Sequence, residues 1–441
     1  MNPHDSSPEA PLKAATHDAP GVDSAYAWWR LACTLLLVTC GGVGMWSVVV
    51  SLPAIQAEFG VARGAASLPY AATMVGVGFA GLAMGRMADR FGVAVPVVMG
   101  ILCLGAGYPL AAASGSLAQF VAVQGLLLAA GCAASFSPLI ADTSLWFERR
   151  RGLAVGICAS GNYLAGALWP PVLQHFIETA GWRQTHVWVG VFCLAVMLPA
   201  SLVLRRRPPG AGSPGAARAA SASVSRPLGM APATLQFLLL VAGFGCCVAM
   251  AMPQVHMVAY CADLGYGPAR GAQLLSVMLA CGVVSRLGFG MISDRIGGLR
   301  TLMVGSGLQC LALLLFLPAQ GPASLTLVAA LFGLFQGGIV PAYAIIVREH
   351  FTAAETGTRV AMIITATLFG MALGGWMSGA IFDLTGSYAA AFLNGIGWNA
   401  VNLIIAAFLL HRARGAGPGG SLRWPEPPLQ TRAGAQGEAP R

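Results

Sequence analysis

Residues 85–92 read GRMADRFG, and residues 290–297 read GMISDRIG. Both octapeptides follow the pattern G-x-x-x-D-R-x-G, and their first residues are 205 positions apart. Each octapeptide comes directly after the second apolar run of its half of the chain. A match at equivalent places in the two halves predicts an internal repeat, with each half built on the same plan.

The composition indicates whether the surface of the protein faces water or lipid. Of 441 residues, 56% are hydrophobic and only 9% are charged. A soluble domain carries about 25% charged residues, so this chain has too few charges to cover a water-exposed surface. A helix that spans a bilayer needs roughly 20 mostly apolar residues. We therefore expect an all-α membrane protein and exclude a soluble globular class.

Runs without charge predict twelve transmembrane helices in two pseudo-symmetric six-helix bundles. The expected helices cover residues 31–54, 66–85, 93–112, 117–140, 153–176, 184–204, 232–254, 271–293, 301–318, 323–347, 360–382 and 388–410. Five regions follow from them: a disordered cytoplasmic tail (1–29), an N-terminal bundle (30–204), a linker (205–230) rich in Pro, Gly and Arg, a C-terminal bundle (231–410) and a disordered cytoplasmic tail (411–441).

The basic residues indicate the orientation in the membrane. With both chain ends in the cytoplasm, only Arg63, Arg183 and Arg270 fall in loops of the other face, and Arg286 falls within a span. This asymmetry follows the positive-inside rule. It accounts for the formal net charge of +9 through topology and contacts with membrane lipids, without a nucleic-acid partner. No nucleotide-binding, hydrolase or metal-site motif is present, so we expect neither an enzyme nor a cofactor.

The repeated loop has a physical interpretation of its own. Glycine at its start lets two helices approach closely, the aspartate can cap a helix of the opposite half, and the arginine can pair with a carboxylate across the seam, such as Glu148 or Glu355. We expect the two loops to act as a latch on the cytoplasmic side; a structural turn with positive-inside charge is the alternative. The latch residues are Gly85, Asp89, Arg90, Gly92, Gly290, Asp294, Arg295 and Gly297.

Arg286 is the only charged side chain that we place in the core of a span. It precedes Asp294 by eight residues, or about 12 Å along a helix, which is too far for the side chain to reach water at the helix end. Placing arginine at the bilayer centre costs about 2.5–3.5 kcal/mol. Its neighbours one turn away are Gly282 and Gly290, so this face is expected to meet the protein interior. A guanidinium facing a cavity predicts an anion-binding site; an arginine bonded to carbonyls that staples helices is the alternative.

The repeated loop resembles the signature loop between helices 2 and 3 of the major facilitator superfamily. Within that superfamily, SRLGFGMISDRIG (285–297) resembles helix 8 of the monocarboxylate transporters and of the oxalate–formate antiporter relatives. Further matching passages are LPAIQAEFGVARG (52–64), WFERRRGLAVGICASG (146–161) and MPQVHMVAYCADLGY (252–266). An arginine eight residues before the loop aspartate contacts the substrate carboxylate in both groups, and the resemblance implies this role for Arg286.

Departures from the family pattern bear on the substrate. Oxalate carriers have a lysine in helix 11 where this chain has Thr367, and one cation in place of two favours a monocarboxylate. Proton-coupled monocarboxylate transporters often have an aspartate where this chain has Gly282, and many proton-coupled members have an arginine in helix 4 where it has Val121. The glycine-rich helix 5 pattern of drug antiporters is absent from residues 156–171, which counts against drug export.

Polar residues in apolar spans are secondary candidates for the cavity lining. For each of them, a hydrogen bond between helices is the alternative. We also expect His256, placed just past the end of the seventh span, to be able to assist proton coupling. The candidates for substrate binding besides Arg286 are Tyr70, Asn162, Tyr163, Gln336, Tyr343 and Thr367.

The sequence thus predicts a monomeric secondary active transporter in a bacterial inner membrane, working by alternating access on a small organic anion, with protons or a counter-anion as the coupled species. Two alternatives stay open: an exporter of drugs or metabolites of the same superfamily, and a non-transporting anion receptor. The identity of the carboxylate, uptake or export, and symport or exchange are not distinguished by these residues.

Overall fold

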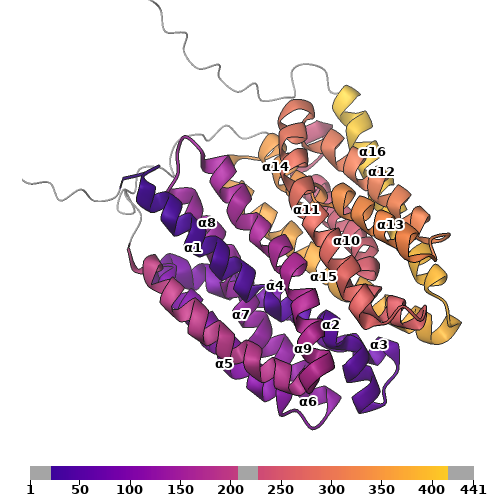
Figure 1. Cartoon of the computed structure of the whole chain (residues 1–441). Coiled ribbons are helices and arrows are strands. Elements are labelled where there is room, and N and C mark those ends of the chain that lie inside the picture. Colours follow the sequence, from indigo (N-terminus) through magenta and orange to yellow (C-terminus); the bar gives the residue numbers. More distant parts are fainter. Residues whose placement is uncertain (1–20, 207–226, 416–441) are drawn as a thin grey trace, which may run out of the picture.

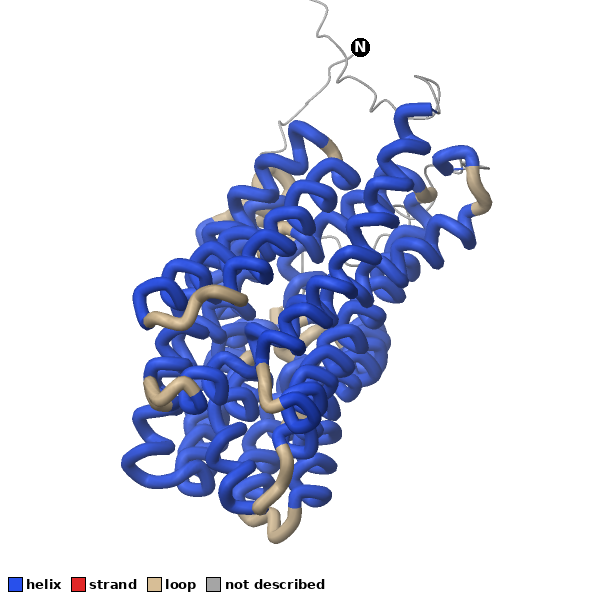
Figure 2. The backbone as a smooth tube through the Cα atoms, turned by 90° about the vertical axis from the view of Figure 1, so that its right-hand side faces the viewer, coloured by secondary structure: helices blue, strands red, loops and turns tan. Residues whose placement is uncertain are grey.

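The structure is a computed structural model that describes residues 21–206 and 227–415. Among these residues every regular element is a helix, as the tube in Figure 2 shows. The expected tails and linker fall largely on residues 1–20, 207–226 and 416–441, which lie outside the described residues.

Helices of the N-terminal half form the indigo-to-magenta part of Figure 1. They are α1 (Ala25–Gly41), α2 (Val43–Phe59), α3 (Arg63–Ala66), α4 (Leu68–Phe91), α5 (Ala94–Ala112), α6 (Leu117–Val123), the π-helical turn η1 (Gln124–Leu128), α7 (Ala129–Ala134), α8 (Ser137–Leu145), α9 (Arg151–Ser201) and the 3-10 turn η2 (Leu202–Arg205).

Helices of the C-terminal half form the red-to-yellow part of Figure 1. They are the short 3-10 turn η3 (Pro227–Gly229), α10 (Pro232–Asp263), α11 (Pro268–Ile296), α12 (Gly298–Phe316), α13 (Pro322–Gln336), α14 (Ile339–His350), α15 (Ala353–Thr385) and α16 (Tyr388–Gly415).

The helices provide twelve membrane crossings. Eleven stretches of the described residues are long and apolar enough to span a bilayer. The longest, at 55 residues, would extend about 80 Å as one straight helix, far beyond the hydrocarbon thickness. It is interrupted at Gly181, whose φ of 79° and ψ of 158° are not helical. Residues 151–180 and 182–201 are therefore two crossings, and the predicted all-α architecture of twelve helices is confirmed.

Both ends of the described chain lie at one end of the bundle. Helix α1 begins and α16 ends at the top of Figure 1, which we call the terminus-bearing end; the opposite end is called the distal end. The halves meet along two long seams, where α9 packs on α11 and where α3 and α4 pack on α15. Helix α10 also packs on α2 between these seams.

Small residues set the packing inside each half. A Cβ on Gly76 of α4 would lie 2.0 Å from the carbonyl oxygen of Gly125, and a Cβ on Gly333 of α13 would lie 1.9 Å from that of Met278 in α11. Both sites join the second and fourth spans of their halves. Helix association in lipid relies on such close backbone approach, so the internal repeat extends from the loop to the helix contacts.

Several helices are longer than the sequence predicts. Helix α1 begins at Ala25 because Ser24 caps it, its Oγ accepting a hydrogen bond from the amide of Ala27. Helix α10 continues through Pro253 to Asp263, so the expected end of the seventh span near 254 is wrong. Gln254 and His256 each hydrogen-bond to another helix, Gln254 to Gln336 and His256 to the carbonyl of Gly375, so these polar side chains are accommodated within a helix.

A buried ion pair stabilises the terminus-bearing end of the N-terminal half. Arg30 of α1 lies 2.8 Å from the carboxylate of Asp142 in α8, and both side chains are buried. The Arg30 guanidinium also donates to the carbonyl of Val203 at 2.5 Å and lies 4.7 Å from the ring centroid of Trp146. Buried charge is therefore not confined to Arg286, although Arg30 and Asp142 lie near the ends of their helices.

Removing one partner of this pair should destabilise the fold. An Asp142→Ala variant leaves the Arg30 guanidinium buried without its counter-charge, and such losses typically cost about 3–5 kcal/mol. We expect a clear fall in the melting temperature of the detergent-solubilised protein, measured by tryptophan fluorescence. Glu355→Ala is the matched control because it breaks the i,i+4 pair with Arg359, a type worth only about 0.3–0.5 kcal/mol. Equal melting temperatures for the two variants would contradict this assignment.

Candidate functional site

Arg286 lies on α11 at the seam with α9 of the other half. Its Nη1 donates to the carbonyl of Ala159 at 2.9 Å, and its Cζ lies 4.5 Å from the ring centroid of Tyr163. Its Nε is buried without a hydrogen-bond partner. Among the described residues, no carboxylate lies within ion-pair distance of the guanidinium. The side chain is thus held at the seam and leaves most of its donors free for a ligand.

The local sequence explains why Arg286 reaches Tyr163. A Cβ on Gly282, one turn earlier, would lie 2.6 Å from the Tyr163 ring, so only glycine lets the ring pack there. Ser285 holds the other side of α11 by accepting the amide of Gly337 at 3.1 Å. Gly290, one turn later, is exposed, and a Cβ added to it would have no neighbouring atom within 4 Å. The predicted interior face therefore holds for Gly282 but is wrong for Gly290.

The two halves are joined only over part of their length. Within the described ranges, hydrogen bonds between the halves link Arg63 and Gly64 to the C-terminal half, Ser276 to Ala167, and Arg286 to Ala159. Following α11 from the distal end, Arg286 is the last of these. On the second seam, Phe79 of α4 faces Phe369 of α15. Along α11, Arg286 thus makes the last hydrogen bond between the halves before the terminus-bearing end.

Tyr70 and His256 meet at one residue of α15. A Cβ on Gly375 would lie 3.0 Å from the Tyr70 ring, and the carbonyl of Gly375 lies 2.8 Å from His256 Nε2. Tyr70 Oη and His256 Nδ1 are buried without a partner. His256 lies inside α10 and is fully buried, so its expected place near the outer mouth is wrong. The two residues form a polar junction between the halves.

The remaining predicted binding residues are not gathered around Arg286 by hydrogen bonds. Gln336 accepts a hydrogen bond from Gln254 at 2.7 Å, the Tyr343 hydroxyl donates to Asn402 at 3.0 Å, and Thr367 Oγ1 donates to the carbonyl of Ile364 at 2.7 Å. Asn162 is half-buried, with Oδ1 facing the break between α1 and α2 at Gly42. Gln336 keeps a buried, unpartnered Nε2, whereas Tyr343 and Thr367 are satisfied within the C-terminal half.

The two repeated loops are unpaired in this conformation. Asp89, Arg90, Asp294 and Arg295 are exposed, and none has an ion pair in the described part of the chain. Gly85, like Gly290, has no atom within 4 Å of an added Cβ, so the expected close helix approach is not made here. Gly92 and Gly297 end their helices with matching φ values of 86° and 81°. The suggested partner Glu355 pairs with Arg359 instead.

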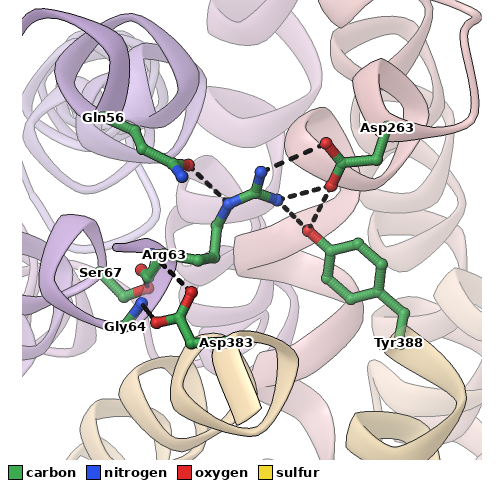
Figure 3. A network of polar contacts seen from close by, with 7 residues as sticks. All are labelled: Gln56, Arg63, Gly64, Ser67, Asp263, Asp383 and Tyr388. Atoms are coloured by element: carbon green, nitrogen blue, oxygen red, sulfur yellow. Dashed lines mark hydrogen bonds and ion pairs between the residues drawn. The ribbon is translucent and has the colours of Figure 1, made fainter. Parts of the chain in front are cut away.

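Sequence reasoning missed a polar network at the distal end, shown in Figure 3. Arg63 at the start of α3 donates to Gln56 at 2.6 Å, to Asp263 at 2.8 and 3.3 Å, and to the Tyr388 hydroxyl. The Tyr388 hydroxyl donates to Asp263 at 3.1 Å. The available signal was Arg63 itself, one of only three basic residues predicted in the loops of that face.

Asp383 completes this network from the end of α15. Its carboxylate accepts the backbone amides of Arg63 at 2.8 Å and Gly64 at 2.7 Å, as Figure 3 shows. A carboxylate at a helix start satisfies amides that have no partner within the helix. The same segment of the N-terminal half is thus bound by two carboxylates of the C-terminal half.

Comparisons with known proteins agree with this architecture. A family model described as Major Facilitator Superfamily matches residues 34–329 and 289–435. Monocarboxylate transporter 13 of Bos taurus is 29% identical over 315 residues, 70% of this chain and 71% of that protein. An MFS-type transporter of Gibberella moniliformis is 28% identical over 312 residues, 69% of this chain and 72% of that protein.

Among solved structures, a bacterial homolog of the human lysosomal transporter Spinster, in an inward-facing and occupied conformation, aligns with a TM-score of 0.69. The alignment covers 88% of this chain and 97% of that chain at 15% identity, which shows a shared fold. The predicted resemblance to the superfamily and to its monocarboxylate transporters is confirmed. This chain belongs to the major facilitator superfamily, whose members are membrane transporters and not enzymes.

Proposed function

We propose that this protein is a secondary active transporter of a small organic monoanion, with Arg286 as the ligand of the substrate carboxylate. The observation that carries the proposal is the state of this guanidinium: it lies at the seam with one hydrogen bond to a carbonyl and with its Nε buried and unpartnered. A buried donor without a partner is costly, and a carboxylate binds a guanidinium in a planar, two-pronged geometry. An anion is the ligand that satisfies both conditions.

The charge at the site supports a monocarboxylate. Arg286 has no second cation among its hydrogen-bond or ring contacts, since Ala159 and Tyr163 supply a carbonyl and an aromatic face. The position where oxalate carriers have a lysine is Thr367, whose hydroxyl is bonded within α15. The relatives named monocarboxylate transporters support the same class of substrate. Tyr163 then serves to hold the guanidinium plane in place, and Tyr70, Asn162 and Gln336 supply further polar groups.

In the proposed mechanism, access to Arg286 alternates between the two ends of the seam. The anion enters through the separated terminus-bearing part, reaches Arg286 and competes with the carbonyl of Ala159 for the guanidinium. Neutralising the charge lets the surrounding helices close, and the two G-x-x-x-D-R-x-G loops then latch the terminus-bearing end. The moving units are the bundles of residues 30–204 and 231–410, joined by the linker 205–230. His256, buried with a free Nδ1, is the candidate group for coupling to protons.

The orientation of the protein in the membrane is inferred from its sequence. Basic residues concentrated at the terminus-bearing end favour a cytoplasmic location for this end and for both tails, and the proposed membrane is a bacterial inner membrane. The transporter acts as a monomer surrounded by lipid, with the small anion and a coupled proton or counter-anion as its only required partners.

Replacing Arg286 should abolish transport and leave the fold intact. In proteoliposomes, we expect Arg286→Ala to lower counterflow of radiolabelled lactate or pyruvate by roughly 10- to 100-fold, because a charge-assisted hydrogen bond contributes about 1.5–3 kcal/mol. Arg300→Gln, an exposed arginine of α12, is the control and should retain its flux. Unchanged flux in Arg286→Ala would refute the proposed ligand, and transport of drugs but of no tested acid would favour the exporter alternative.

The latch residues should affect transport without affecting stability. Asp89→Asn and Asp294→Asn change exposed side chains that have no ion pair in this conformation, so the melting temperature should shift by less than the equivalent of about 0.5 kcal/mol. Flux should fall because closure of the terminus-bearing end loses its helix caps. Melting temperature and initial transport rate are measured on the same preparations. Normal flux in the double variant would contradict the latch.

A further inference from the structure

The polar network around Arg63 joins the two halves, which distinguishes it from the other inter-helix ion pairs of the described chain. Arg30 and Asp142 both belong to the N-terminal half, and so do Arg183 and Glu58. The Arg63–Asp263 pair instead connects α3 with α10. We call the residues Gln56, Arg63, Asp263, Asp383 and Tyr388 the Arg63 cluster. Any movement that separates the halves at the distal end has to break it.

The guanidinium of Arg63 is close to saturation. It donates four hydrogen bonds to Gln56, Asp263 and Tyr388, and its Cζ lies 4.9 Å from the ring centroid of Phe382. Only 7% of Arg63 is exposed. Arg286 makes a single hydrogen bond by comparison. The Arg63 cluster is therefore a completed contact that joins the two halves at the distal end.

The acidic partner is placed so that this contact can be broken. Asp263 is 36% exposed, and a cavity of about 470 Å³ borders it together with Tyr260, Phe382 and Tyr388. Water can therefore take over the hydrogen bonds of the carboxylate when Arg63 leaves. Partly exposed ion pairs are weak for this reason. A fully buried pair such as Arg30–Asp142 would make the separation far more costly.

The seam beneath the cluster is built from small groups. A Cβ on Gly64 would lie 3.1 Å from the backbone of Ala380, and a Cβ on Gly379 would lie 2.8 Å from Ser67 Oγ. Small residues allow this close approach of α3 and α4 to α15, so few side chains beneath the cluster have to move when the helices separate. The Arg63 cluster adds a specific, charged contact to this part of the seam between the halves.

We propose that the Arg63 cluster is the distal gate of the carrier: Arg63, bound by Asp263, Asp383 and Tyr388 of the other half, closes the distal end in this conformation and is released when that end opens. The gate rests on the chain being an alternating-access carrier. It is independent of which substrate is carried and of the role of Arg286, and its test needs no substrate.

Accessibility of position 67 tests the gate directly. Ser67 is fully buried beneath the cluster, where its hydroxyl donates to the carbonyl of Arg63 at 2.7 Å. A Ser67→Cys variant in detergent is exposed to a charged methanethiosulfonate reagent, and labelling is followed by intact mass against the parent protein, whose eleven native thiols are buried or half-buried. Adding Arg63→Gln or Asp263→Asn should raise the labelling rate of the introduced thiol by about tenfold or more, because charge-assisted bonds across the seam are lost.

Matched variants separate the gate from general loosening. Arg183→Gln removes an arginine of the same end whose partner Glu58 lies in the same half, so labelling of the introduced thiol should not change. Arg63→Lys keeps one charge for Asp263 and should give an intermediate rate. Tyr388→Phe removes only the phenol bridge and provides a reading if the charge variants do not fold. Unchanged labelling in the cluster variants, or an equal rise in Arg183→Gln, would overturn the proposal.

Discussion

A buried guanidinium needs oxygen atoms around it, and three arginines of this chain meet this need differently. Arg30 has a buried carboxylate from its own half, so it fixes helices that do not move apart. Arg63 takes its carboxylate from the other half, at a place that water can reach. Arg286 has only a carbonyl and an aromatic face. The number of partners and the half that supplies them differ among the three arginines, and these differences support the proposed roles of Arg63 as a gate and Arg286 as a ligand.

These three environments agree with the shape of the seam. The distal end combines the charged network of Figure 3 with tight contacts between small residues, such as Gly379 against Ser67. The terminus-bearing end has exposed, unpaired loop residues such as Asp89 and Asp294. The same repeated loop that would make contacts in one state is free in the other, as expected for two packings of similar energy. In the proposed transport cycle, the structure would be the state in which the distal end is closed.

The sequence predicted what depends on composition and local pattern. Apolar runs identified the twelve crossings, and the spacing from Asp294 placed Arg286 within a span, where α11 has it. It could not predict pairs that form only after folding: Arg30 and Asp142 are 112 residues apart, and Arg63 and Asp263 are 200 apart. His256 was misplaced for the same reason, because its acceptor is the carbonyl of Gly375, 119 residues away. From sequence alone, a polar residue near the end of an apolar run is predicted to lie in a loop, because the distant residue that pairs with it is not known.

In the proposed transport cycle, the positive charge of Arg286 at the α9–α11 seam also determines which step the membrane voltage affects. With a monoanion bound to Arg286 the site carries no net charge, whereas the empty site carries one positive charge. A unit charge that crosses a whole membrane changes its energy by about 2.3 kcal/mol for each 100 mV of potential. In exchange of the monoanion for a counter-anion, with no proton carried, reorientation of the loaded carrier would be electrically silent, and the membrane voltage would act on the return of the empty carrier.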